Sequence, residues 1–526
     1  MRIKWQANGP IQGGEKIGQR YHISINPAPW LMKHHHDLHG RARVQWLVPD
    51  FIADETAEQQ VHALVRDQVD LLLLPCFVWN IDLQLEVARL FKQHRPEAHV
   101  VMGGPQLTAH KDSSFMHEHP YVDYVVYGDG ERALTDIIDY LATGTRGDWV
   151  NTVERDRVWP HEVLRDQLYW STSPYLTQKT HIRDSLEALY RKGYTNEHVM
   201  LAVEFARGCM YRCAYCDWSQ NLSNKVTRRK AEWKRELEFF KELDVSIRET
   251  DANFGQWRED LEIYDYAKSL HEPGRNFKFL VWNTAKLKRN ADHFMIGNVE
   301  TYGHRFILSV EDTEREVLDA IDRPSLPWSE HQALLDRVRT RLGTERFQDT
   351  AHAELMLGLP RQTLDTFREN YVKITLEGIR KIILNQWVYA VNSPGADKEY
   401  LSRHGIVFTE HRLYQPGDHD SLPPDVGEAY QMASTSPHFL KQQMVTETSY
   451  MTMTDMLTVM EANRVIQHNG VVRAQLDKVL STEDAREQVS KIIAYVFERS
   501  ARVAKDRYDS HKVLIEKHGF VLAHLL

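Results

Sequence analysis

The sequence has few cysteines, and it contains no long apolar segment. Its longest apolar stretch, residues 71–78, is far too short to cross a bilayer, and the first residues lack the apolar core of a signal peptide. Four cysteines in 526 residues do not make a disulfide framework, and a reduced compartment suits them better. These shortages argue against a membrane protein and a disulfide-rich secreted one, and they predict a cytoplasmic location.

The sequence also has no excess of positive charge, since 65 Lys and Arg residues stand against 74 Asp and Glu and the formal net charge is −9 at pH 7. This balance argues against a general nucleic-acid-binding surface and favours a small-molecule or peptide substrate. The chain shows no internal repeat and no low-complexity segment. At 526 residues it is too long for one ordinary core, so two or three domains are expected.

Three of the four cysteines, Cys209, Cys213 and Cys216, fall within eight residues. A Cys-x3-Cys-x2-Cys triplet can give three thiolates to a [4Fe-4S] cluster, which leaves the fourth iron without a protein ligand. That open iron can bind a small molecule and pass an electron to it. Three thiolates can instead join a histidine around zinc, although no paired Cys-x2-Cys or His-x3-His motif lies nearby.

The first 145 residues alternate short apolar runs with helical patterns. This alternation predicts an α/β fold with a parallel, doubly wound sheet that binds ligands at the carboxyl ends of its strands. Glycines follow two of these strands, at Gly103-Gly104-Pro105 and Gly128-Asp-Gly130-Glu131, where they either form plain turns or let the backbone approach a bulky ligand. The expected strands are residues 21–26, 44–48, 69–74, 99–102 and 121–126, and the expected helices are residues 55–66, 83–94 and 130–141.

Residues 146–195 have no sustained period and are interpreted as a linker between domains. Six further strand–helix units follow and predict a partial parallel barrel, with the cysteine loop at the end of its first strand, where such barrels place their chemistry. The predicted domains are residues 1–145, 196–420 and a helical, charged region over 421–526. The expected barrel strands are residues 200–205, 245–250, 277–282, 305–310, 352–357 and 382–387, and the expected helices are 230–242, 259–269, 327–341 and 364–375.

The cysteine triplet, its place after a barrel strand and the preceding doubly wound domain together resemble the radical S-adenosylmethionine (SAM) enzymes with a cobalamin-binding domain, such as the class B methyltransferases. The resemblance covers roughly residues 20–420. It implies a Rossmann-like cobalamin-binding domain, a partial (β/α)6 barrel and a C-terminal helical region. It also implies that the three cysteines hold a [4Fe-4S] cluster, that SAM chelates the open iron, and that an electron donor such as flavodoxin or ferredoxin reduces the cluster.

Residues at the barrel strand ends extend this resemblance. Asp251-Ala-Asn253-Phe-Gly255 is similar to a motif at the end of the second strand, and Ser309-Val-Glu311 with Arg323 is similar to the fourth-strand end that contacts SAM. Gly358-Leu-Pro360 resembles a turn after the fifth strand, with Arg361 in place of a glycine. The SAM contacts that the resemblance implies are Tyr215, Asp251, Asn253, Ser309, Glu311 and Arg323.

In the first domain, Phe77-Val-Trp79-Asn80 resembles an aromatic segment of the same family. The Asp-x-His-x-x-Gly motif, whose histidine ligates cobalt, has only a near match at residues 37–42 that includes His39, and His34-His35-His36 beside it is expected to form a solvated or interdomain loop. Both a cobalamin without a histidine ligand and an empty, degenerate domain stay open. The implied cobalamin contacts are Phe77, Trp79, Asn80, Gly103, Gly104, Pro105, Gly128, Gly130 and Glu131.

The leading hypothesis is a cobalamin-dependent radical methyltransferase, which generates a 5′-deoxyadenosyl radical and methylates an unactivated carbon. In such an enzyme the cofactors carry the chemistry, so the sequence identifies no catalytic side chain. The same cofactors also serve rearrangement, cyclisation or dehydration without methylation, and a non-catalytic cobalamin or redox sensor is a third possibility. A methylthiotransferase is disfavoured because the chain has no second cysteine triplet.

Overall fold

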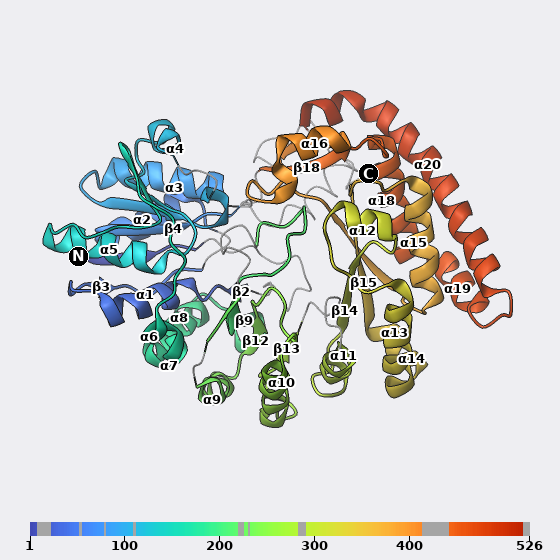
Figure 1. The fold of residues 1–526 in the computed structure, drawn as a ribbon, viewed down its shortest axis with the longest axis horizontal. Coiled ribbons are helices and arrows are strands. Elements are labelled where there is room, and N and C mark those ends of the chain that lie inside the picture. Colours follow the sequence, from blue (N-terminus) through green and yellow to red (C-terminus); the bar gives the residue numbers. More distant parts are fainter. Residues whose placement is uncertain are drawn as a thin grey trace.

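The computed structural model describes residues 1–7, 23–51, 55–77, 80–108, 112–218, 226–229, 232–281, 291–412 and 441–518. An N-terminal sheet lies beside an arc of barrel strands and helices, and the C-terminal helices lie on the far side of the barrel from that sheet (Figure 1). Among the described residues, no helix combines the length and the apolar character that a membrane crossing requires.

The N-terminal sheet has the strand order β3-β1-β4-β5-β6-β7-β8, and its first five strands run parallel. The strands are β1 (Arg2–Trp5), β3 (Gln45–Trp46), β4 (Leu71–Pro75), β5 (His99–Gly103), β6 (Tyr124–Val126), β7 (Thr152–Glu154) and β8 (Arg157–Val158). The helices are α1 (Ala28–His39), α2 (Ala57–Arg66), α3 (Ile81–His94), α4 (Ser114–Glu118) and α5 (Glu131–Thr143).

Strand β4 explains why the sheet is covered on both faces. Its five residues are all buried, as a parallel strand between two helical layers requires. Leu72 and Leu74 pack in one core with residues of α2 and α3, whereas Leu71 and Leu73 join the core that includes α5. The doubly wound α/β architecture predicted from the sequence is therefore confirmed.

One strand was predicted in the wrong sheet. Residues 21–26 were expected in the first sheet, but β2 (Ile23–Ile25) pairs in parallel with β9 (Val199–Val203) of the barrel, with Ile23 opposite Val199. Strand β1, which the sequence analysis did not predict, occupies the first sheet instead, with Ile3 and Trp5 buried. An apolar strand this short carries no signal of which sheet it joins, because partner strands are fixed by tertiary packing.

Residues 146–195 are also more ordered than the predicted linker. Strands β7 and β8 extend the first sheet in antiparallel fashion. They are followed by α6 (Gln167–Ser171), α7 (Pro174–Thr177) and α8 (Lys179–Arg191). Helix α8 buries Ile182, Leu186 and Leu189, which share one face of a helix because they are four and three residues apart. This segment therefore contributes to the core.

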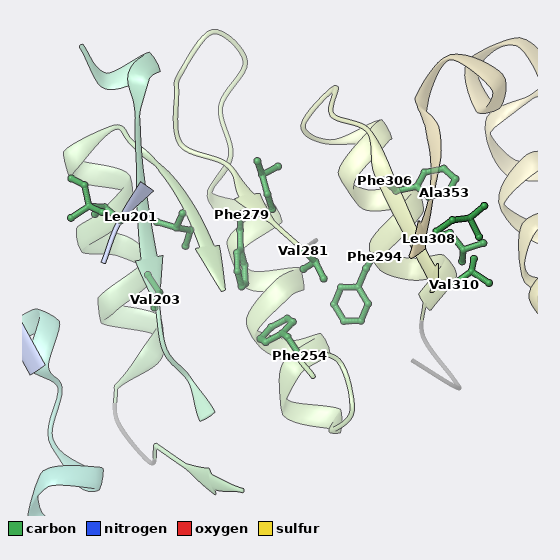
Figure 2. Close-up of a cluster of buried hydrophobic side chains, with 14 of the residues drawn as sticks. Leu201, Val203, Phe254, Phe279, Val281, Phe294, Phe306, Leu308, Val310 and Ala353 are labelled. Carbon is green, nitrogen blue, oxygen red and sulfur yellow. The ribbon is translucent and has the colours of Figure 1, made fainter. Parts of the chain in front are cut away.

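All six predicted barrel strands are present, in two parallel sheets of order β13-β12-β9-β2 and β14-β15-β16. Figure 2 shows the core they share, where Leu201, Phe279 and Leu308 come from three different strands. The other strands are β12 (Ser246–Glu249), β13 (Phe279–Leu280), β14 (Phe306–Glu311), β15 (Ala351–Leu357) and β16 (Lys381–Gln386), with a short ladder of β10 (Ala206–Arg207) and β11 (Thr227–Arg228). The helices are α9 (Trp233–Leu243), α10 (Arg258–Leu270), α11 (Ala291–Glu300), α12 (Arg315–Ala320), α13 (Trp328–Leu342), α14 (Thr344–Thr350), α15 (Leu364–Leu376) and α16 (Lys398–His404).

The C-terminal region is helical, as predicted, after an antiparallel pair of strands, β17 (Val407–Arg412) and β18 (Lys441–Glu447). Its helices are α18 (Met453–His468), α19 (Gly470–Val479) and α20 (Ala485–His518). Met451 and Met456 are buried in the main core. The predicted domain boundary at residues 420–421 lies outside the described residues.

Candidate cofactor sites

The cysteine loop begins where β9 and β10 end. Cys209 and Cys213 are buried, Cys216 is half-buried, and none of the three is in a disulfide. Gly208 directly before the first cysteine has φ of +101°, a conformation that glycine adopts without strain. The Ala214 amide donates to the Ile321 carbonyl at 2.8 Å, so the end of the fourth barrel unit holds the loop.

Two residues of the second-strand motif support this loop. The Asp251 carboxylate accepts the Phe205 and Ala206 amides at 2.8 and 2.9 Å, and Asn253 Nδ2 lies 3.1 Å from Cys209 Sγ. Within the described residues, no partner is found for the buried atoms Asp251 Oδ2 and Asn253 Oδ1. A buried polar atom without a partner costs about 1–3 kcal/mol, so these two oxygens are candidates for ligand contacts.

The fourth-strand residues gather around Arg323, whose guanidinium is 1% exposed. It donates to Tyr215 Oη at 2.5 Å and to the Ser309 carbonyl at 2.7 Å, and it lies 3.2 Å from Glu311 Oε1. The Tyr215 hydroxyl itself is 3.3 Å from the same Glu311 oxygen. Four of the six predicted SAM residues therefore form one network.

Glu311 has a backbone conformation that glutamate rarely adopts. Its φ is +64°, and the register of β14 against β15 shifts between Ser309 and Glu311. Left-handed backbone at a residue other than glycine costs about 1–3 kcal/mol, and it concentrates at functional sites. Glu354 on β15, which the sequence analysis missed, accepts the Ser309 hydroxyl at 2.6 Å. No local pattern marked it, because its role depends on the neighbouring strand.

A cavity of about 240 Å³ opens at the carboxyl ends of β4, β5 and β6. An open α/β sheet binds its ligands at this edge. Trp5, Asn26 and Met32, which were not predicted, also contribute to the cavity lining. The predicted cobalamin residues that line it are Phe77, Gly103, Gly104, Pro105, Gly128 and Gly130.

Gly104 has to be glycine for two independent reasons. Its φ is +109°, and a Cβ there would lie 2.7 Å from the Cys76 carbonyl oxygen. Of the other predicted cobalamin contacts, Asn80 does not line the cavity and Trp79 lies outside the described residues. Asn80 bonds to its own turn, through Nδ2 to the Pro75 carbonyl and Oδ1 to the Phe77 amide.

Glu131 occupies a different site from the predicted one. It is buried and accepts Arg207 Nη2 at 2.7 Å and the Tyr169 hydroxyl at 3.0 Å. Arg207 also bonds Asp129 at 3.2 Å and Glu204 at 2.7 Å. Burial alone would raise the pKa of Glu131, but the Arg207 guanidinium outweighs it and holds that pKa below its usual value. Glu131 thus joins the cavity loop of the first sheet to the residue that precedes Gly208 and Cys209.

The histidine segment does not form the predicted loop. His34, His35 and His36 are buried in helix α1, where His34 bonds Thr172 and Thr177 and His35 bonds Thr135. His39 ends the same helix, pairs with Asp166 at 2.6 Å and is not among the residues that line the strand-end cavity. These partners are distant in sequence, so no local pattern signalled that the histidines are buried.

Residues 42–138 match the family model of the B12 binding domain. The chain is 30% identical over 392 residues to the cobalamin-dependent radical SAM methyltransferase TokK of Streptomyces tokunonensis, covering 69% of this chain and 53% of that protein. It is 29% identical over 452 residues to 2-(S-pantetheinyl)-carbapenam-3-carboxylate methyltransferase of Streptantibioticus cattleyicolor, covering 80% and 62%. The chain thus spans between half and two thirds of the length of these curated relatives.

Solved structures share the fold at low sequence identity. The cobalamin-dependent SAM radical enzyme OxsB with aqua-cobalamin and SAM bound aligns with a TM-score of 0.57 at 13% identity, over 98% of this chain and 74% of that one. The radical SAM methyltransferase TsrM from Kitasatospora setae, with cobalamin and a [4Fe-4S] cluster bound, aligns with a TM-score of 0.56 at 12% identity, over 96% and 99%.

The fold is therefore a doubly wound B12-binding domain joined to a barrel, and it matches solved structures of cobalamin-dependent radical SAM enzymes. The chain carries a B12-binding domain and is homologous to the cobalamin-dependent radical SAM methyltransferases. This confirms the resemblance and the fold class that the sequence predicted.

Proposed function

We propose that this chain is a cobalamin-dependent radical SAM methyltransferase that methylates an unactivated carbon of a small molecule. One observation carries the proposal: Arg207 joins the two candidate cofactor loops. It lies two residues before Cys209, and it bonds Asp129 and Glu131 in the loop whose Gly128 and Gly130 line the first-domain cavity. A buried ion pair of this kind holds two loops of distant sequence in one relative position.

The residues of each loop fit the group assigned to it. Three cysteines outside any disulfide suit a [4Fe-4S] cluster, and the amide of Asn253 beside Cys209 Sγ suits a donor to a ligating sulfur. The unpartnered Asn253 Oδ1 and the network of Glu311 and Tyr215 suit the polar groups of SAM. The glycine-lined cavity suits a bulky ligand such as cobalamin. The cavity is smaller than cobalamin, so it would hold one edge of that ligand and leave the rest outside.

When these groups are bound, the reduced cluster and SAM supply a 5′-deoxyadenosyl radical, and cobalamin supplies the methyl group. The protein's own contribution is position. Asp251 fixes the start of the cysteine loop through the amides of Phe205 and Ala206. Arg323 holds Tyr215 and Glu311 together while its own charge is neutralised, and the first-domain cavity offers a mainly apolar lining.

A small-molecule substrate is the choice that the curated relatives favour. One relative is named for a carbapenam carboxylate, and a structure of the fold neighbour TsrM contains a tryptophan substrate. Glu354 is a candidate to recognise the substrate or SAM, since it is half-buried beside Ser309 on the neighbouring strand and its burial raises its pKa.

The test is anaerobic reconstitution of the full chain with iron, sulfide and cobalamin, followed by addition of SAM and a reductant. We expect both 5′-deoxyadenosine and S-adenosylhomocysteine. The variant Cys213→Ala should lose the cluster absorbance and the 5′-deoxyadenosine. The matched control is Cys76→Ala, which removes the buried fourth cysteine in the first domain and should retain both.

The two products separate the rival functions. 5′-Deoxyadenosine without S-adenosylhomocysteine would favour a non-methylating radical enzyme. Neither product with any reductant would contradict the proposal and favour a sensor.

A further inference from the structure

A second polar cluster lies apart from both candidate cofactor sites. His35 and His39 of α1 and Asp166, which directly precedes α6, bring one ligand atom each to within 4.8 Å of one another. The two histidines are four residues apart on one helix, so their rings lie on the same face; their centroids are 4.7 Å apart. Two histidines at this spacing are a common half of a metal site.

Local structure positions Asp166 as the third ligand. One of its oxygens, Oδ1, accepts the Tyr169 amide at 3.0 Å and caps helix α6. The other oxygen, Oδ2, lies 2.6 Å from His39 Nε2. The cap fixes the carboxylate while leaving one oxygen directed at the histidines.

The proton on His35 can be placed from its neighbours. The Thr135 hydroxyl donates to the Glu131 carbonyl at 3.0 Å, so it has to accept the bond from His35 Nδ1 at 2.8 Å. With the proton on Nδ1, the Nε2 atom of the neutral ring presents a lone pair. A hydrogen bond from the second ring nitrogen is the usual support of a metal-binding histidine.

These three residues line a cavity of about 470 Å³ that shares no lining residue with the strand-end cavity. Its lining carries four carboxylates, from Asp136, Asp139, Glu162 and Asp166, against three guanidinium groups. Counting the carboxylates and guanidinium groups alone, the formal charge of the lining is negative by one. A cation is therefore favoured, and space remains beside it for a further ligand.

We propose that His35, His39 and Asp166 bind a divalent transition-metal ion such as Zn²⁺, with a fourth position open to this cavity. Two imidazoles and a carboxylate are an established ligand set for zinc. Ligand atoms around tetrahedral zinc lie about 3.3 Å apart. His39 and Asp166, now 2.6 Å apart, therefore need to separate by less than about 1 Å, and the more distant ligand atoms, which lie within 4.8 Å of one another, need to approach by at most about 1.5 Å. His39 is exposed enough at the end of α1 to make this movement. The ion would fasten α1 to α6, next to the Tyr169–Glu131–Arg207 contact.

The test measures zinc bound by the full chain after its iron–sulfur cluster has been reconstituted, so that the cysteines are occupied in every sample. After equilibrium dialysis against Zn²⁺, elemental analysis should find about one equivalent more zinc on the wild type than on His39→Gln or Asp166→Asn. Asparagine keeps the helix cap, so Asp166→Asn removes the ligand with little damage to α6. Zinc should also raise the Tm of the wild type and leave the Tm of both variants unchanged.

Two control variants of the same helix match the test pair. His34→Gln removes a buried histidine whose ring nitrogens both bond threonines, and Asp37→Asn removes a carboxylate that bonds Lys33 and Gln178. Both should keep the zinc. Equal zinc on the wild type, His39→Gln and Asp166→Asn would overturn the proposal, and so would loss of zinc from His34→Gln as well. Because zinc is measured directly, neither result depends on methyl transfer.

Discussion

The two candidate cofactor sites are built by opposite means. At the barrel end, polar side chains converge, with Arg323 bonded to Tyr215, to Glu311 and to the Ser309 carbonyl. At the strand ends of the first sheet, a mainly apolar cavity is kept open at four positions that carry no side chain, Gly103, Gly104, Gly128 and Gly130. The first site should therefore be broken by removing atoms, and the second by adding one.

The largest effect is expected from Arg323→Met, which removes the centre of the barrel network. Loss of one partner of a buried ion pair leaves the other charge unpaired and costs about 3–5 kcal/mol, here at Glu311. Urea unfolding should show this loss, together with weaker cluster absorbance. The control is Arg315→Met, because the pair of Arg315 with Asp319 is exposed and should be worth no more than about 1 kcal/mol. Equal stability of the two variants would mean that the network does not hold the site.

The opposite change, addition of one atom, should break the first-domain cavity. In Gly104→Ala the new Cβ meets the Cys76 carbonyl at 2.7 Å and the residue keeps a φ of +109°. We expect a loss of about 2–3 kcal/mol from backbone strain and the clash together, and reduced retention of cobalamin on gel filtration.

Gly144→Ala is the matched control, since Gly144 also has positive φ, +72°, but no atom lies within 4 Å of the added Cβ. It should show the cost of left-handed backbone strain alone, about 1–2 kcal/mol. If both variants retain cobalamin equally, the close approach at Gly104 does not shape the cavity.

How far the sequence can predict each site depends on whether the site is built from local patterns or from partners that are distant in sequence. The cysteine triplet and the six barrel strands are local patterns, such as the wholly buried run of β9, and both the barrel and the placement of the loop after a strand were predictable. Glu131 was predicted at the cofactor because its loop motif is local, but its partner Arg207 lies in the other domain. The prediction for β2 was wrong for the same reason, since its partner strand β9 is distant in sequence.

The histidines of α1 show most clearly what cannot be predicted from the sequence alone. The spacing of His35 and His39 is visible in the sequence, yet Asp166 and Thr135, which give that spacing a meaning, come from other segments. Burial of His34 likewise depends on Thr172 and Thr177. Chemistry that depends on such distant partners needs the fold before it can be predicted.

Acidification should destabilise the first domain, because helix α1 contains the buried histidine His34. Burial lowers the pKa of His34 to about 4, below its value of about 6.5 in the unfolded chain. The unfolded state therefore binds more protons between these two values, and stability falls as the pH is lowered through about 6.5 towards 4. Between pH 7 and pH 5 we expect His34 alone to account for about 2 kcal/mol of lost stability.

The measurement compares urea unfolding of the wild type and His34→Gln at both pH values. The variant should be less stable at pH 7 but should lose less on acidification, because glutamine does not titrate. If the two proteins show the same pH dependence, His34 is not the titrating group. The barrel histidines His331 and His352 also have a pKa lowered by burial, so the wild type and the variant should both keep an acid response from that region.

The smallest effect, Ser309→Ala, sharpens the account of the barrel network. The Ser309 hydroxyl donates to Glu354 at 2.6 Å, while its carbonyl serves Arg323 and is unaffected by the substitution. Loss of one hydrogen bond to a carboxylate should cost about 1–2 kcal/mol, and exposed Ser171→Ala, which loses only a bond to its own helix, should cost less than about 0.5 kcal/mol. Calorimetry with SAM separates two roles: weaker SAM binding means that the hydroxyl belongs to the cofactor site, whereas unchanged binding assigns Ser309 to the positioning of Glu354 alone.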